Sequence, residues 1–151
     1  MALDDRVPRN ASLGLLLRLA GQHWTHAVES ALAEAGFDGL RPPHSNVFTF
    51  TPPEGIQVSE LSKLAHVRKQ SMAQAVDELE KLGYVERRPD PRDGRARLVF
   101  LTARGRQVKP VAMAAGDRVD RRWRELTSSA EIESLRRALR SLLDRLHGPA
   151  A

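Results

Sequence analysis

Apolar residues recur at helical spacing through the first part of the chain. The stripe runs over residues 13–35 with a period of about 3.6 residues, and Ser12 in front of it is a suitable helix N-cap. Gly36 is placed to end this helix. Four prolines then interrupt residues 39–55, so only a short helix around residues 45–51 fits between them.

Two further apolar patterns predict a pair of short helices joined by a tight turn. Ser59 is the expected N-cap of the first helix, which ends near His66. The second helix spans about residues 69–82, and one of its faces carries the apolar side chains Met72, Val76 and Leu79. The opposite face of this helix is polar.

A strand, a turn and a second strand follow the helix pair. Strand-forming residues fill positions 84–88, residues 89–94 read PDPRDG and predict a turn, and apolar residues alternate with mainly basic ones over 95–100. Positive charge is concentrated here, because eight basic residues face two acids over 87–109, against a net charge of +5 for the chain. The cluster indicates a surface for nucleic acid or another polyanion, and a solvated basic face is the alternative.

The C-terminal third predicts two more helices. Thr102 is the expected N-cap of a long helix, in which Pro110 and Gly116 predict a kink or a break. Ser128 and Glu131 form a capping-box pattern at the start of the next helix. That helix carries an apolar stripe at the spacing of a helix–helix seam, made of Ile132, Leu135, Leu139, Leu142, Leu143 and Leu146. Such a stripe needs an apolar partner, so we predict an obligate dimer.

Composition excludes several classes of protein. Without cysteine the chain has no disulfide, thiolate nucleophile or cysteine-ligated zinc site. Its longest stretch without Asp, Glu, Lys or Arg, residues 42–53, is too short to span a bilayer, and residues 1–10 lack the apolar core of a signal peptide, so we expect a cytoplasmic protein. Common catalytic motifs do not occur, so we expect neither an enzyme nor a cofactor. His23 and His26 could bind a metal, but without a clear third ligand we expect a solvated pair and no metal.

The polar face of the second short helix carries candidate DNA contacts. Gln70 and Gln74 are four residues apart, and a glutamine amide can pair bidentately with adenine in the major groove. Lys69 at the start of the helix is placed to bind phosphate. A solvated helix face would carry the same glutamines, which is the alternative for these residues. A helix pair followed at once by a basic hairpin is the layout of a winged helix-turn-helix.

A family resemblance becomes specific at the hairpin. Residues 83–105 read GYVERRPDPRDGRARLVFLTARG and closely resemble the wing of the MarR family of bacterial transcriptional regulators, whose pattern is D-x-R, a strand and then L-T-x-x-G. The matching residues here are Asp93, Arg95, Leu101, Thr102 and Gly105. The preceding run QVSELSKLAHVRKQSMAQAVDELEKLGYVERR resembles the family's helix-turn-helix, so motif-level similarity covers about residues 55–105, and the helical order covers nearly the whole chain.

The turn departs from the family pattern at two positions. His66 stands where many relatives have glycine, and histidine tolerates a left-handed backbone better than most residues. Arg68 stands where many relatives have a Ser or Thr N-cap, which makes it a candidate phosphate contact.

The resemblance implies a mainly α protein with a small β-hairpin wing, in which a winged helix-turn-helix is flanked by N- and C-terminal dimerisation helices. It implies a helical dimerisation region, residues 1–40 and 103–151, and a DNA-binding region, residues 41–102, forming one intertwined domain. It also implies that Arg95 enters the minor groove and that Asp93 holds it. The expected DNA-binding residues are Arg68, Lys69, Gln70, Ser71, Gln74, Arg92, Asp93, Arg95 and Arg97, with Arg88 a weaker candidate.

Relatives often hold a small aromatic acid or a similar effector between the dimer helices and the winged domain. The corresponding residues here would be His23, Trp24, His44 and Phe48, although ordinary packing or surface roles explain each of them as well. We therefore predict a dimeric, sequence-specific regulator of double-stranded DNA, a repressor at pseudo-palindromic sites that a small-molecule effector releases. The alternatives are a winged-helix protein or RNA interaction module, and an architectural DNA binder without effector control.

Overall fold

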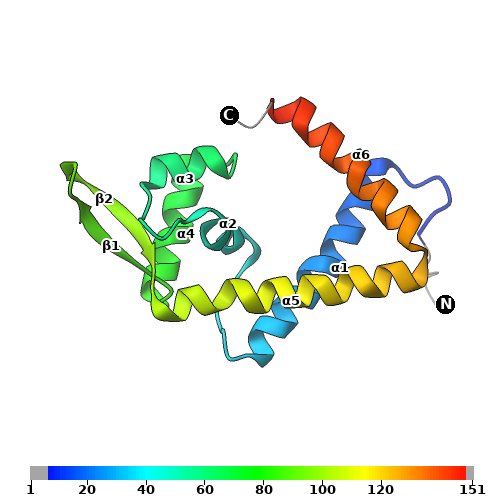
Figure 1. Cartoon of the computed structure of the whole chain (residues 1–151), viewed down its shortest axis with the longest axis horizontal. Coiled ribbons are helices and arrows are strands. Elements are labelled where there is room, and N and C mark those ends of the chain that lie inside the picture. The colour runs from blue at the N-terminus through cyan, green and yellow to red at the C-terminus, as the bar shows by residue number, and fades with distance from the viewer. Residues whose placement is uncertain (1–6, 149–151) are drawn as a thin grey trace.

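The computed structural model describes residues 7–148, and the described part is helical except for one β-hairpin (Figure 1). The predicted fold class is confirmed. The elements in chain order are α1 (Leu13–Glu34), the 3-10 helix η1 (Pro42–His44), α2 (Ser45–Phe50), α3 (Val58–Leu64), α4 (Lys69–Lys81), β1 (Val85–Asp90), β2 (Asp93–Leu101), α5 (Ala103–Leu126) and α6 (Ser129–His147). Residues 1–6 and 149–151 lie outside the described residues. They are the two ends of the predicted dimerisation region, and residues 1–6 also begin the N-terminal segment in which no signal peptide is expected.

Three of the predicted helix caps form as expected. The side-chain oxygens of Ser12, Thr102 and Ser128 accept backbone N–H groups in the first turns of α1, α5 and α6. Figure 1 shows α5 running across the molecule from the base of the hairpin to α6, with α1 crossing it. We call α1, α5 and α6 the helical frame, and both α2 and the hairpin contact it through α5.

Of the kink or break predicted in the long helix, the break is wrong, because α5 continues through both Pro110 and Gly116. Proline removes one backbone N–H from the helix ladder. Around it, Val108 is buried in the core, and Val111 and Ala112 pack against the core. We attribute the continuity of α5 to this packing, which offsets the loss of one hydrogen bond.

The first helix of the helix-turn-helix begins earlier than the sequence pattern predicts. Helix α3 starts at Val58, so Ser59 lies inside its first turn and is not the N-cap. The cause is a contact distant in sequence: Ile56 and Val99 exchange backbone hydrogen bonds of 3.1 and 2.8 Å. This bridge keeps the chain extended up to Gln57, and the helix begins directly after it.

The turn between α3 and α4 tolerates both departures from the family pattern. His66 has a φ of 53°, so histidine adopts the left-handed conformation that glycine would take. Arg68 provides no side-chain cap, but its backbone C=O accepts the N–H of Met72 at 3.0 Å, and α4 begins at Lys69 as predicted. Helix α4 therefore forms with its first turn uncapped by a side chain.

The hairpin has longer strands and a tighter turn than its sequence predicts. Pairing continues to Asp90 and Asp93, which leaves Pro91 and Arg92 as the turn in place of the six residues 89–94. Pro89 pairs with Arg97 and the next pair is Asp90 with Asp93, so residues 94–96 of β2 have no partner on β1. This bulge contains Arg95, and bulges commonly redirect a side chain away from the sheet.

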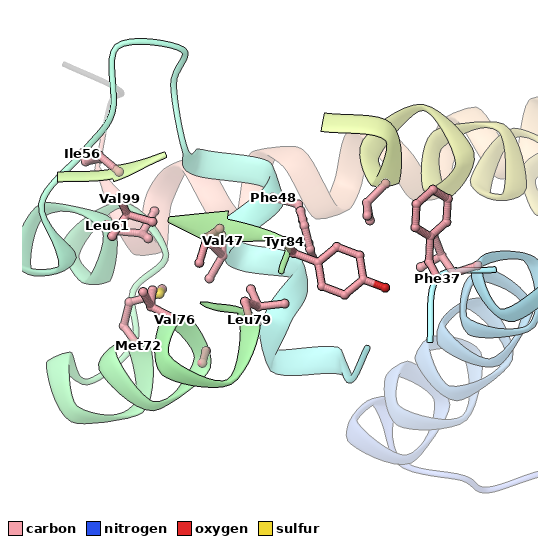
Figure 2. Close-up of a cluster of buried hydrophobic side chains, with 14 residues drawn as sticks. Phe37, Val47, Phe48, Ile56, Leu61, Met72, Val76, Leu79, Tyr84 and Val99 are labelled. Carbon is pink, nitrogen blue, oxygen red and sulfur yellow. The ribbon is translucent and has the colours of Figure 1, made fainter. Parts of the chain in front are cut away.

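The core lies between the helix-turn-helix and the base of the hairpin. Figure 2 shows a group of buried side chains gathered there: Val47, Leu61, Met72, Val76, Leu79 and Val99. Tyr84 is fully buried, its ring stands edge-on to Phe48 with centroids 5.9 Å apart, and its hydroxyl donates to the carbonyl of Asp38 at 3.0 Å. The core therefore fixes α4 relative to the hairpin that follows it.

Candidate nucleic-acid interface

Helix α4 buries one face and exposes the other. Its apolar residues Met72, Ala75, Val76 and Leu79 enter the core. The five predicted contact residues of this segment are all exposed: Arg68, Lys69, Gln70, Ser71 and Gln74. A polar helix face standing clear of the core is the geometry that major-groove recognition requires.

One of these residues, Gln74, has a side-chain hydrogen-bond partner on the same helix. The Gln74 amide donates to Glu78 Oε1 at 3.2 Å, one turn further along α4. Hydrogen bonds from Arg41, His44 and Gln74 lower the pKa of the Glu78 carboxyl from 4.5 to about 2, so Glu78 is ionised at neutral pH. No local pattern in the sequence points to Glu78, because its partners Arg41 and His44 lie 37 and 34 residues away.

The wing presents Arg92 and Arg95 as exposed side chains, and neither guanidinium forms a hydrogen bond or ion pair within residues 7–148. The expected clamp between Asp93 and the Arg95 guanidinium is not present. Asp93 Oδ1 instead accepts the backbone N–H of Arg95 at 3.1 Å. A short aspartate side chain reaches an N–H two residues ahead more readily than a long, flexible guanidinium. Asp93 therefore shapes the backbone that carries Arg95.

Asp90 is the buried anchor of the wing tip, and no sequence pattern marks it as one. It is 6% exposed, its Oδ1 accepts the backbone N–H of Arg92 at 2.9 Å, and its Oδ2 accepts the side-chain amide of Gln57 at 3.1 Å. The Arg92 and Gln57 hydrogen bonds hold the pKa of Asp90 below its ordinary 3.8. Gln57 precedes α3, so this contact ties the turn of the hairpin to the helix-turn-helix.

The remaining wing arginines are engaged within the protein. Arg97 donates to the backbone carbonyl of Arg87 at 3.0 Å, and Arg88 pairs with Glu86 and lies over the Phe100 ring at 4.7 Å. These contacts occupy Arg97 and Arg88, so Arg92 and Arg95 are the stronger candidates for DNA contact.

Arg87 joins the wing to helix α4. Its guanidinium bridges Asp77 and Glu80 of α4, each at 2.6 Å. The side chain of Arg87 is only 19% exposed. We infer that this bridge holds β1 against α4 and so fixes the distance between the wing and the exposed face of α4.

The L-T-x-x-G pattern has a structural explanation at the base of the wing. Thr102 Oγ1 accepts the backbone N–H of Gly105 at 3.1 Å and donates to the carbonyl of Gly83 at 2.7 Å. A Cβ on Gly105 would lie 2.0 Å from the backbone oxygen of Tyr84. These residues join α5 to the hairpin and fix the orientation of the wing relative to α5.

A cavity of about 620 Å³ lies between α1, the η1–α2 segment and α5, with Arg136 of α6 also in its lining. Of the residues proposed for an effector, it is lined by Trp24, His44 and Phe48. His23 instead lines a separate hollow of about 290 Å³ beside Trp123. The other lining residues are both apolar, such as Val28 and Leu32, and charged: Arg41, Lys109, Arg136, Glu29, Asp117 and Asp120.

Trp24 and His44 also have partners within the protein, which agrees with the alternative that they serve ordinary structural roles. The Trp24 ring stands edge-on to Trp123 with centroids 5.6 Å apart. His44 is 1% exposed and contacts Glu78 through Nε2 at 2.7 Å. No group of three or more metal-ligating side chains comes together within residues 7–148, where His23 and His26 are both exposed.

Comparison with known proteins assigns the family. The sequence model described as the MarR family matches residues 38–96. The chain is 30% identical to the HTH-type transcriptional regulator YdcH of Bacillus subtilis over 74% of this chain and 77% of that protein, and 28% identical to the transcriptional regulator HosA of Escherichia coli O111:H- over 90% and 97%. The crystal structure of CouR from Rhodococcus jostii, bound to p-coumaroyl-CoA, superposes with a TM-score of 0.71 at 26% identity and covers 97% of this chain and 99% of CouR.

In the part of the chain that the structure describes, no helix combines the length and apolar character needed to cross a membrane.

The segment matched by the family model contains α4 and most of the wing, and the matches to the two bacterial regulators extend well beyond it. The chain belongs to the MarR family of winged helix-turn-helix transcriptional regulators, which are DNA-binding proteins and not enzymes.

Proposed function

We propose that this regulator binds a specific, pseudo-palindromic site on double-stranded DNA as a homodimer. The observation that carries the proposal is the joint exposure of the polar face of α4 and of Arg95 in the bulge of β2. Helix α4 and the hairpin lie at the same end of the molecule (Figure 1). A helix supplies contacts in the major groove, and a basic hairpin reaches the adjacent backbone or minor groove.

The exposed side chains divide into two kinds of contact. Arg68, Lys69 and Arg92 are exposed basic residues at the start of α4 and in the turn of the wing, so we assign them to phosphates. The first turn of α4, which has no side-chain cap, leaves backbone N–H groups that favour a phosphate at the same place. Gln70, Ser71 and Gln74 can reach base edges, and Arg95 suits a narrow minor groove.

Dimerisation through the terminal helices is supported by apolar surface that the single chain leaves uncovered. Within residues 7–148, α6 has no buried residue, and Leu146 is 67% exposed. Leu13, Leu16 and Leu17 on α1 are exposed as well. We assign residues 1–40 and 103–151 to a dimerisation region, and residues 41–102 to the DNA-binding region, which a two-fold axis would present to successive grooves.

We further propose that the regulator is a repressor and that a small aromatic acid releases it from DNA. The cavity combines Trp24, Val28 and Phe48 with the basic residues Arg41 and Lys109, which suits an apolar ring with an acidic group. The relative CouR holds an aromatic acyl thioester, p-coumaroyl-CoA. A cavity of this size and lining favours effector control over the alternative of an architectural DNA binder.

Mobility-shift assays with the purified chain test the proposal. DNA is first selected from a random double-stranded pool, and binding to the selected site is then measured against unrelated DNA, against RNA competitor, and with salicylate or p-coumarate added. Affinity for the selected site should fall steeply with salt, with a slope of about 0.9 per phosphate neutralised, and RNA should not compete. Equal binding to RNA, or binding without sequence preference, would instead support an interaction module or an architectural protein.

A further inference from the structure

Glu78 connects two residues of the cavity wall to the exposed face of α4. Its side chain is 29% exposed, and its two oxygens have different partners. Oε2 accepts from the Arg41 guanidinium and contacts His44 Nε2 at 2.7 Å, whereas Oε1 accepts from the Gln74 amide at 3.2 Å. Arg41 and His44 both line the cavity. One carboxylate thus connects a cavity wall to a predicted base-reading side chain.

On the cavity side, the contact between His44 and Glu78 is rigid because both nitrogens of the His44 ring form hydrogen bonds. The ring is buried, and its Nδ1 accepts the backbone N–H of Arg41 at 3.0 Å. In the neutral ring the proton is therefore on Nε2, which donates it to Glu78. A buried ring bonded at both nitrogens cannot rotate without losing both contacts. The Glu78 carboxylate is consequently oriented by η1 as well as by its own helix.

On the other side, this carboxylate determines how the Gln74 amide presents itself. A carboxylate only accepts hydrogen bonds, so the amide must turn its nitrogen toward Glu78. One of the two amide N–H groups is used in that contact. The other N–H and the carbonyl oxygen remain, and these are the donor and acceptor that bidentate recognition of adenine requires.

We propose that Glu78 is a positioning residue for sequence recognition, which holds the Gln74 amide in its base-reading orientation and links that orientation to Arg41 and His44 in the cavity wall. This inference rests on the proposed DNA-binding function. It also identifies the ligand chemistry able to act on readout, since an anionic group bound in the cavity competes with Glu78 for the Arg41 guanidinium, whose side chain is 56% exposed.

The test measures the specificity ratio, the affinity for the selected DNA site divided by the affinity for unrelated DNA, in the full chain. Gln74→Ala should lower this ratio by about 5- to 150-fold per half-site, the range for one bidentate base contact. Glu78→Gln should lower it as well, since the uncharged amide no longer requires the nitrogen of Gln74 to face it. The double variant should lose little beyond Gln74→Ala, because the two residues act as one unit.

Glu60→Gln is the matched control. Glu60 is an exposed acid on the neighbouring helix α3, so its replacement removes the same negative charge from the helix-turn-helix. Both Glu→Gln changes raise attraction to any DNA, and this effect cancels in the ratio. Glu60→Gln should therefore keep the wild-type ratio. Thermal unfolding of every variant separates loss of readout from loss of folded protein.

Arg41→Met provides a second, milder perturbation that leaves the Glu78–Gln74 contact possible. It should lower the ratio in the wild-type background and have no further effect in the Glu78→Gln background. A wild-type ratio in Glu78→Gln, or fully additive losses in the double variant, would overturn the inference while the proposed function stands. A wild-type protein with no sequence preference would overturn the proposed function, and this inference with it.

Discussion

Replacing Gly105 by alanine should destabilise the joint between the wing and the helical frame. The added Cβ would lie 2.0 Å from the backbone oxygen of Tyr84, at least 1 Å closer than real Cβ contacts. Neither side can withdraw freely, since Tyr84 is fully buried and its carbonyl accepts the backbone N–H of Thr102 at 3.0 Å. Separation of α5 from this carbonyl must therefore disturb either the core or that hydrogen bond.

The size of the effect follows from three contributions. Overpacking costs about 1–3 kcal/mol, a weakened hydrogen bond costs about 1 kcal/mol, and alanine in a helix gains at most about 1 kcal/mol over glycine. The net loss of unfolding free energy is thus about 1–3 kcal/mol, which lowers Tm by roughly 3–10 °C for a chain of this length.

Thermal unfolding followed by circular dichroism, at one fixed protein concentration, measures the effect of Gly105→Ala. Gly94→Ala is the control, because a Cβ at Gly94 meets nothing within 4 Å and the residue lies in the wing, away from the terminal helices. Its Tm should stay at the wild-type value or rise slightly. A wild-type Tm in Gly105→Ala would show that the close approach to Tyr84 does not constrain the fold.

Three further predictions concern the wing and the Glu78 network. Arg95→Ala should weaken binding to the selected DNA by roughly 1–3 kcal/mol per wing in mobility-shift assays and leave Tm unchanged, because the side chain is exposed and has no partner within residues 7–148. Arg41→Met should raise the pKa of Glu78 from about 2 toward 4.5, as measured by a carboxyl NMR titration. In the wild type the lowered pKa stabilises the fold above pH 4.5, and this stabilisation is lost as the pH falls toward 2. The variant should therefore lose less unfolding free energy than the wild type between pH 4.5 and pH 2. Asp90→Ala should speed hydrogen exchange at the Arg92 amide, whose acceptor it removes, and unchanged exchange would refute the anchor.

The sequence predicts those features that depend on neighbouring residues. The caps at Ser12, Thr102 and Ser128 each bond to an N–H three residues ahead, and such local geometry is encoded in a short stretch of chain. The polar face of α4 follows from helical periodicity in the same way. The wing required the family resemblance as well, since many basic hairpins share its composition.

Features that depend on residues distant in the chain could not be predicted. Ser59 is the best local cap near the start of α3, but the bridge between Ile56 and Val99 decides where that helix begins. Asp90 and Glu78 are ordinary acids in the sequence and acquire roles only when folding brings residues more than 30 positions away beside them. Hydrophobic patterning does not encode such polar pairings, so the supporting shell of the candidate site emerged only from the structure.

Sequencing the DNA that the purified chain selects from a random double-stranded pool tests the central claim most directly. A dimer that places α4 in successive major grooves should enrich an inverted repeat whose half-sites are centred about 10–10.5 base pairs apart, or a multiple of that spacing. An A·T-rich segment should flank each half-site where Arg95 enters the minor groove. A pool that stays random, or a single half-site without two-fold symmetry, would contradict the account.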